Sequence, residues 1–250
     1  MVEKDRIPSV WTRPTSSPRS PALNRAAIVR EAISMLDEDG IEALSMRKLG
    51  ARLNAGATSM YRHVATKDEL MELAVDEVLG EVVVPESIEG SWRNAVTTCA
   101  DSFRATALRH PWVCAELGQA GLAYLGPNLA SVIERLLNLL TRTGFADPHT
   151  AVDALFSYSI GMSTTESAWL TTVARSGQTE AEFLARLLEP TAAEGGHGPD
   201  EHNATADLDP VAIRDLKFAN GLDIVLDGLN TRLSGTSLSG APSGDAPDKG

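Results

Sequence analysis

Residues 58–64 read TSMYRHV, and they gather side chains that donate hydrogen bonds, which is the chemistry needed to hold a polar partner. If the stretch is helical, at about 100° per residue, its apolar side chains form one seam and three polar side chains lie on the opposite face. Those three are Thr58, Ser59 and Arg62. Tyr61 and His63 lie toward the two edges of that face. Small hydroxyls around one arginine suit the edges of DNA bases, and the flanking donors suit phosphate oxygens.

The same side chains also have simpler interpretations. Tyr61 alone would be a half-buried core tyrosine, and His63 alone an ordinary surface histidine. A catalytic interpretation has little support, because the chain holds no Gly-rich phosphate loop, no H-E-x-x-H, no paired-cysteine spacing and no G-x-S-x-G. The remaining histidines are scattered along the chain. We therefore expect neither an enzyme nor a protein-bound metal or cofactor.

Four short helical patterns would position this stretch. Apolar residues recur at i, i+3, i+4 and i+7 in a first helix from Asn24 that Gly40 closes. The same spacing predicts a second helix over 46–53 with Ser45 as its N-cap, and a third over 57–64. Thr66-x-x-Glu69 is a capping box that opens a fourth. The second and third patterns are separated only by Asn54-Ala55-Gly56, which predicts a helix-turn-helix whose tight turn uses a residue tolerant of positive φ.

The rest of the chain is also helical by pattern, which makes the predicted fold all-α. A three-helix DNA-binding domain with its fourth helix is expected over 23–83, and a larger all-helical body over 84–233. Asp147-Pro148 opens a long helix that is apolar on nearly all sides and should be buried. Residues 1–22 are interpreted as a flexible arm, 190–208 as a mobile acidic loop, and 234–250 as a disordered tail.

Charge is distributed unevenly along the 250 residues, whose net charge is −12. Residues 1–63 hold 10 Lys and Arg against 7 Asp and Glu, whereas residues 64–250 hold 12 against 27. A mildly basic N-terminal module can still attract phosphate, because the attraction is local. Two cysteines, no apolar run of membrane-spanning length and no apolar N-terminal stretch predict a cytoplasmic protein without membrane contact.

Residues 24–80 resemble the DNA-binding domain of the tetracycline-repressor (TetR) family of bacterial transcription regulators. The resemblance is carried by AAIVREAISMLDEDGIEALSMRKLGARLNAGATSMYRHVATKDELMELAVDEV, above all by its SMRKL, MYRHV and KDEL. It implies a homodimer that binds a double-stranded DNA operator and a small-molecule effector. The implied DNA-binding residues are Ser45, Arg47, Lys48, Thr58, Ser59, Tyr61, Arg62, His63 and Lys67.

Two positions depart from the family pattern. Gly50 stands where Ala is usual, which we interpret as closer helix packing that offsets roughly 1 kcal/mol of helix propensity. Asn54 stands where the turn usually has Gly, and asparagine tolerates the left-handed conformation.

The body holds candidates for a mostly apolar effector pocket. They are Phe103, His110, Trp112, Tyr124, Phe156, Tyr158, Met162, Glu166 and Trp169, although each residue taken alone is more often core than ligand wall. Glu166 lies in an otherwise apolar helix and needs a partner, either a ligand or an arginine across the dimer. The resemblance places the dimer interface on the helices at 147–173 and 210–231.

The sequence thus predicts a ligand-responsive transcription regulator, a repressor released from a palindromic operator by a small, largely apolar molecule. An activator of the same fold stays open as an alternative. So does a helical ligand-binding protein or enzyme that no longer binds DNA.

Overall fold

The computed structural model of the chain describes residues 23–86, 91–120, 126–188 and 209–234, and all regular structure in them is helical. The elements are α1 (Arg25–Asp39), the 3-10 turn η2 (Ile41–Ala43), α2 (Met46–Arg52), α3 (Ala57–Tyr61), α4 (Lys67–Leu79), α5 (Trp92–Arg109), α6 (Val113–Ala120), α7 (Pro127–Arg142), α8 (Pro148–Ser176), α9 (Glu180–Leu188) and α10 (Pro210–Ser234). The predicted all-α fold is confirmed.

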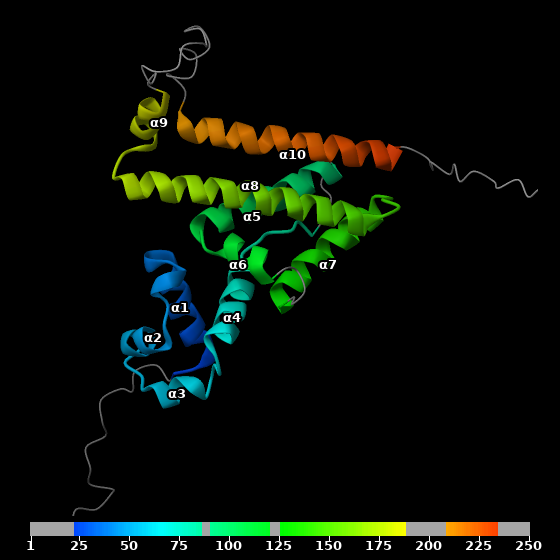
Figure 1. Cartoon of the computed structure of the whole chain (residues 1–250). Helices are drawn as coiled ribbons and strands as arrows, with labels where there is room; N and C mark the ends of the chain where they lie inside the picture. The colour runs from blue at the N-terminus through cyan, green and yellow to red at the C-terminus, as the bar shows by residue number, and fades with distance from the viewer. Residues whose placement is uncertain (1–22, 87–90, 121–125, 189–208, 235–250) are drawn as a thin grey trace, which may run out of the picture.

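The N-terminal helices form a small module around its own apolar contacts. Ile28, Leu49 and Met60 are fully buried, one from each of α1, α2 and α3. The turn between α2 and α3 places Asn54 at φ 49°, whereas Gly56 has an ordinary φ of −70°. Asparagine thus supplies the left-handed residue that this turn requires. Figure 1 shows α3 at the end of the molecule opposite α10.

The body is built around α8. Helix α5 packs along it, α10 lies beside it, and α7 and α6 complete the core on the side toward α4 (Figure 1). Helix α4 packs against α1 at one end and against α6 and α7 of the body, so it joins the two parts of the chain. Any movement of the N-terminal module relative to the body therefore involves α4.

The predicted helix starts are confirmed by hydrogen bonds. The Ser45 hydroxyl accepts from the Lys48 amide at 3.2 Å, and the Thr66 hydroxyl accepts from the Glu69 amide at 3.0 Å. The Asp147 carboxylate accepts from the Thr150 amide at 3.1 Å. Side-chain acceptors at these positions satisfy amides that have no partner inside the helix.

Three predictions about helices were wrong. Helix α3 ends at Tyr61 rather than at 64, and Arg62 is its C-terminal cap, so the apolar spacing continues through a turn. Helix α6 was missed because its pattern lies so close to the end of α5. Helix α8 is not buried on all sides, since Ser157, Gly161 and Ala168 are exposed along one face.

Several predicted segments lie outside the described residues. These are the arm at 1–22, the loop at 190–208, the tail beyond α10 and the candidate pocket residue Tyr124. Ser234, the first residue of the predicted tail, is the last residue of α10.

Candidate nucleic-acid interface and effector cavities

The side chains predicted to meet DNA lie on one exposed surface formed by α2, α3 and the start of α4. Seven of the nine are exposed, and Ser45 and His63 are half-buried. The exposed ones are Arg47, Lys48, Thr58, Ser59, Tyr61, Arg62 and Lys67. Tyr61 is 51% exposed, which argues against a core role for this large side chain. Met60 and Val64 are fully buried, as the predicted apolar seam requires.

Gly50 sets how closely α2 and α3 approach. A Cβ built on Gly50 would lie 2.9 Å from the Ala55 carbonyl oxygen and 3.0 Å from the Met60 Sδ. Real Cβ atoms rarely tolerate such contacts, and backbone at this joint cannot move without shifting α3. The interpretation of Gly50 as a packing residue is confirmed.

Arg52 holds the second helix against the first. Its guanidinium lies 2.5 Å from the Glu31 carboxylate and 2.8 Å from the Glu38 carboxylate, both on α1. The hydrogen bond from Arg52, helped by one from Ser34, lowers the pKa of Glu38. Arg52 therefore ties α2 to two carboxylates of α1.

Arg25 lies next to the exposed surface of α2, α3 and the start of α4, and the sequence did not predict this. Its Nε donates to the His63 carbonyl at 3.3 Å, and its guanidinium lies 3.9 Å from Glu69. Arg25 thereby fixes the start of α1 to the joint between α3 and α4. No local sequence signal could have revealed a contact across 38 residues.

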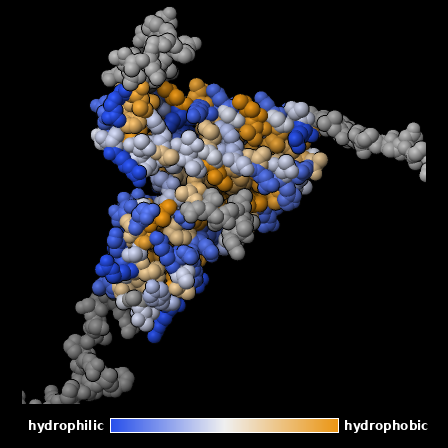
Figure 2. Space-filling view, viewed as in Figure 1, coloured by the Kyte–Doolittle hydropathy of each residue, from blue (hydrophilic) through white to orange (hydrophobic). Residues whose placement is uncertain are grey.

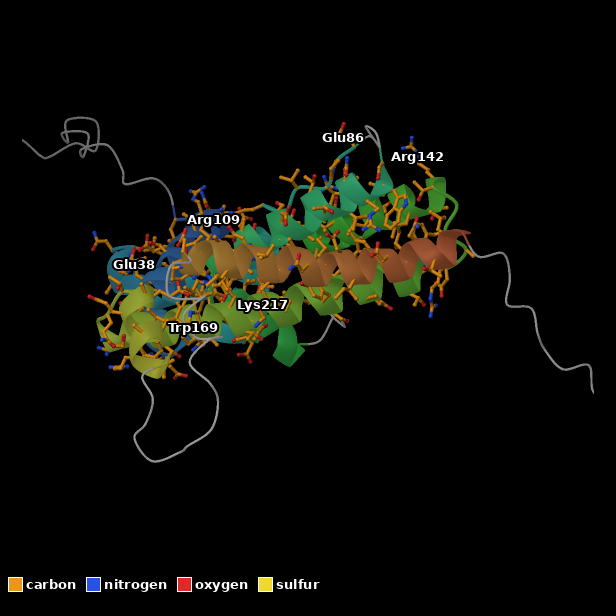
Figure 3. All side chains as sticks on the ribbon, turned by 90° about the horizontal axis from the view of Figure 1, so that it is seen from above. Glu38, Glu86, Arg109, Arg142, Trp169 and Lys217 are labelled. Atoms are coloured by element: carbon orange, nitrogen blue, oxygen red, sulfur yellow. The ribbon has the colours of Figure 1, made fainter. Side chains whose placement is uncertain are left out.

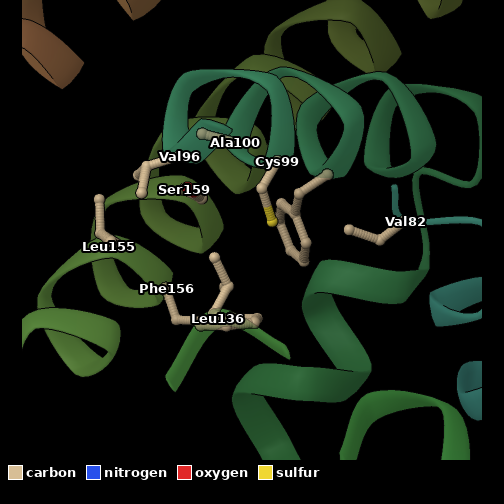
Figure 4. A pocket seen from close by; sticks show the side chains of 9 residues that line it. Val82, Val96, Cys99, Ala100, Leu136, Leu155, Phe156 and Ser159 are labelled. Carbon is tan, nitrogen blue, oxygen red and sulfur yellow. The ribbon is translucent and has the colours of Figure 1, made fainter. Parts of the chain in front are cut away.

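Two hollows in the body hold five of the predicted pocket residues. The first, here called the inner cavity, lies between α5, α7 and α8 (Figure 4) and has a volume of about 20 Å³. Its lining is apolar except for Cys99 and Ser159, and it includes the predicted Phe103 and Phe156. Burial raises the pKa of Cys99 to about 12, so its thiol is a neutral part of the wall.

The second hollow, here called the outer cavity, lies between α8, α9 and the start of α10 and has a volume of about 320 Å³. It includes the predicted Met162, Glu166 and Trp169. The remaining lining residues are Thr165, Glu180, Leu184, Pro210, Ile213, Arg214 and Lys217. Figure 3 shows Trp169 and Lys217 close together near the α9 end of the body.

Glu166 lines the outer cavity and is paired within its own chain. Arg104 of α5 donates to both carboxylate oxygens at 2.7 Å, and Arg214 of α10 donates to one at 2.9 Å. Burial raises the pKa of Glu166, but the hydrogen bonds from the two arginines outweigh it, and the pKa is lower than usual. The partner predicted across a dimer is thus present in the same chain.

His110 and Trp112 line neither cavity. The Trp112 Nε1 donates to the Asp37 Oδ1 at 2.8 Å, and the His110 Nδ1 lies 2.8 Å from the same oxygen. A carboxylate only accepts, so the His110 Nδ1 carries the proton and donates. Asp37 belongs to the last turn of α1, and these two side chains therefore join the body to the N-terminal module.

Comparison with known proteins agrees with this arrangement. Residues 28–74 match the family described as bacterial regulatory proteins, tetR family, and residues 84–233 match the tetracyclin repressor-like C-terminal domain. No described helix is long and apolar enough to cross a membrane.

Relatives and solved structures of the same kind are similar over most of the chain. An HTH-type transcriptional regulator of Saccharopolyspora erythraea is 42% identical over 64% of this chain and 69% of its own length. The HTH-type transcriptional repressor DrrR1 of Streptomyces coeruleorubidus is 30% identical over 92% of this chain and 85% of its own length. The crystal structure of ActR from Streptomyces coelicolor in complex with actinorhodin has a TM-score of 0.69 at 29% identity. It covers 87% of this chain and all of that chain. The chain belongs to the tetR family of bacterial regulatory proteins, and it is a transcription regulator rather than an enzyme.

Proposed function

We propose that the chain is a cytoplasmic repressor that binds a palindromic operator as a homodimer and leaves it when a small molecule binds the body. The observation that carries this proposal is the exposed row of donors on α2, α3 and the start of α4, set on a rigid apolar base. The relative DrrR1 is named a repressor, which supports repression rather than activation. The similar protein ActR binds actinorhodin, which supports a small-molecule effector.

Each of the nine predicted DNA-binding residues then has a distinct role. Thr58, Ser59 and Arg62 read base edges in the major groove, with Arg47 at a further base. Ser45, Tyr61, His63 and Lys67 hold phosphates, and Lys48 adds positive charge beside them. The Ser45 hydroxyl accepts from the Lys48 amide, which leaves its own proton for a phosphate oxygen.

A homodimer through α8 and α10 would cover apolar surface that the single chain exposes. Ile224 of α10 is 74% exposed, and Figure 2 shows hydrophobic side chains over the part of the surface formed by α10. Gly161 on α8 and Gly228 on α10 have open space where a Cβ would be, so a second backbone can approach there. A two-fold interface of this kind would set the recognition helices about 34–36 Å apart, one turn of DNA.

The effector would be a largely apolar molecule bound by the body. Its contacts would come from the predicted residues that line the two cavities, which are Phe103, Phe156, Met162, Glu166 and Trp169. Apolar walls with a few fixed polar groups are usual for small-molecule sites. Glu166 and its arginines are such polar groups.

Selection of DNA from a random duplex pool tests the operator claim. We expect the unmodified protein to enrich a palindrome with half-sites one helical turn apart. A reporter gene behind that sequence should be more active in a host without the protein, and lower activity there would indicate an activator instead. A failure to enrich any sequence at low salt would leave only a helical ligand-binding protein.

A further inference from the structure

We propose that Glu81 and Val82, between α4 and α5, connect the inner cavity to the DNA-binding module, with Asp37 as the positioning residue on α1. This inference rests on the proposed function and assigns a route for its regulation. The route runs from Val82 in the cavity wall through Glu81 and the end of α5 to Asp37.

The first step is the cavity wall. At about 20 Å³ the inner cavity holds about one water, whereas sites for drug-sized ligands measure about 300–1,000 Å³. An occupant must therefore displace part of the wall. Eight of the nine lining residues lie on α5, α7 or α8, and Val82 alone lies on a non-helical segment. Val82 is the part of the wall with the least support from helical hydrogen bonds.

The second step is Glu81, the neighbour of Val82. Its Oε2 accepts from the Arg109 Nη2 at 2.6 Å, and its Oε1 lies 3.5 Å from the His110 Nε2. The His110 Nε2 is buried and has no hydrogen-bond partner among the described residues. Displacement of Val82 would therefore move the neighbouring Glu81 carboxylate relative to the arginine and the imidazole at the end of α5.

The third step crosses to the DNA-binding module. His110 and Trp112 both donate to the Asp37 Oδ1 at 2.8 Å, so a shift at the end of α5 is transmitted to the last turn of α1. The next residue, Glu38, binds Arg52 of α2 at 2.8 Å. Helices α1 and α2 thus respond together, and α3 follows α2 through the tight Gly50 contact. Figure 3 labels Glu38 and Arg109, the chain neighbours of Asp37 and His110.

A side chain that fills the inner cavity mimics an occupant without the need to know the effector. Ala100→Phe adds a ring from the α5 wall, and Ala105→Phe adds the same ring at an exposed position of the same helix. Operator affinity is measured by fluorescence anisotropy on the selected duplex. We expect Ala100→Phe to weaken binding at least about tenfold and Ala105→Phe to leave it unchanged.

The junction is tested by repeating this comparison without the Asp37 carboxylate. In a protein that also carries Asp37→Ala, Ala100→Phe should weaken operator binding by less than about threefold. In the control background Asp39→Ala, which changes an exposed neighbour, the loss of operator affinity should stay near tenfold. Equal losses in both backgrounds, or no loss from Ala100→Phe, would overturn the inference. If Ala100→Phe does not fold by circular dichroism, Ala100→Val makes the same test with a smaller side chain.

Hydrogen exchange tests the route without DNA. In Ala100→Phe, amides of residues 81–84 and of the last turn of α1 should exchange faster than in the unmodified protein, and unchanged exchange in α1 would contradict the route. If no duplex is ever enriched, the proposed function fails, yet this readout still decides whether the cavity and α1 are connected.

Discussion

The Trp112 indole nitrogen donates to the Asp37 carboxylate at 2.8 Å, across 75 residues of sequence. One partner lies in the turn between α5 and α6 and the other in the last turn of α1, so this bond joins the body to the DNA-binding module. His110 donates to the same oxygen, which makes Asp37 the shared acceptor of the junction.

Replacement of Trp112 with Phe tests the strength of this bond. The phenyl ring is smaller than the indole and has no donor, so the unfolding free energy should fall by about 1.5–3 kcal/mol more than it does in a Trp→Phe control without such a hydrogen bond, as for hydrogen bonds to charged groups. Urea denaturation followed by circular dichroism measures it. Trp92→Phe is the matched control, because Trp92 packs edge-on against Phe145 with ring centroids 5.0 Å apart and makes no hydrogen bond through its indole in the described structure. Equal losses in the two variants would show that the Asp37 bond contributes nothing.

Replacement of Gly50 with Ala should destabilise the chain although alanine favours helices. The gain in helix propensity of about 1 kcal/mol is outweighed by overpacking of about 1–3 kcal/mol, because the new Cβ meets backbone at 2.9 Å. We expect a lower midpoint in urea and weaker operator binding. The control is Ala51→Gly, at an exposed position of the same helix, because it changes the helix propensity without changing the packing. A more stable Gly50→Ala protein would rule out the packing role.

Replacement of Glu166 with Gln should cost about 2–3 kcal/mol at pH 7, since it leaves Arg104 and Arg214 short of one buried carboxylate. The folded pKa of Glu166 lies below its ordinary value of 4.5, so this stabilisation is complete above about pH 4.5. It is lost as the pH falls through the folded pKa. Urea titrations from pH 7 to pH 3.5 should therefore show the difference between the two proteins narrowing only at the acid end. Glu134→Gln, an exposed carboxylate, should show no difference.

Replacement of Ile224 with Glu tests the proposed homodimer. A charge at this 74% exposed position is harmless in a monomer and would be buried unpaired in an α8–α10 interface. Sedimentation should show a dimer for the unmodified protein and a monomer for the variant. Val83→Glu places the same charge at an exposed apolar position before α5 and should remain dimeric. A dimeric Ile224→Glu protein would place the interface elsewhere.

Local signals predicted most of the fold. Ser45, Thr66 and Asp147 each carry a side-chain acceptor at the residue before a helix. Each accepts from the amide three residues later, so the capping bond can be predicted from the local sequence. The exposed positions of Thr58, Ser59 and Arg62 likewise follow from helical geometry. The backbone at Arg62 is still in the helical conformation, although α3 ends at Tyr61. The end itself was not predictable, because apolar spacing does not distinguish a helix from a helical turn.

Contacts between distant residues could not be predicted in the same way. Glu166 was recognised as needing a partner, but nothing local identifies Arg104 and Arg214, which lie 62 and 48 residues away. His110 and Trp112 look like pocket residues by composition, and only the packing of α1 against the body shows that Asp37 takes their donors. Side-chain type limits the chemistry of a residue, whereas the tertiary fold decides its partner.

The most direct test of the account is operator binding by Arg62→Ala, measured by anisotropy on the selected duplex at several salt concentrations. Loss of an arginine that reads a guanine should weaken binding by about 1–3 kcal/mol and relax sequence preference at one position of each half-site. Arg232→Ala, at the far end of α10, should bind as the unmodified protein does. If Arg62→Ala binds the operator as tightly and as selectively as the unmodified protein, α3 is not the recognition helix and the proposed mode of DNA binding is wrong.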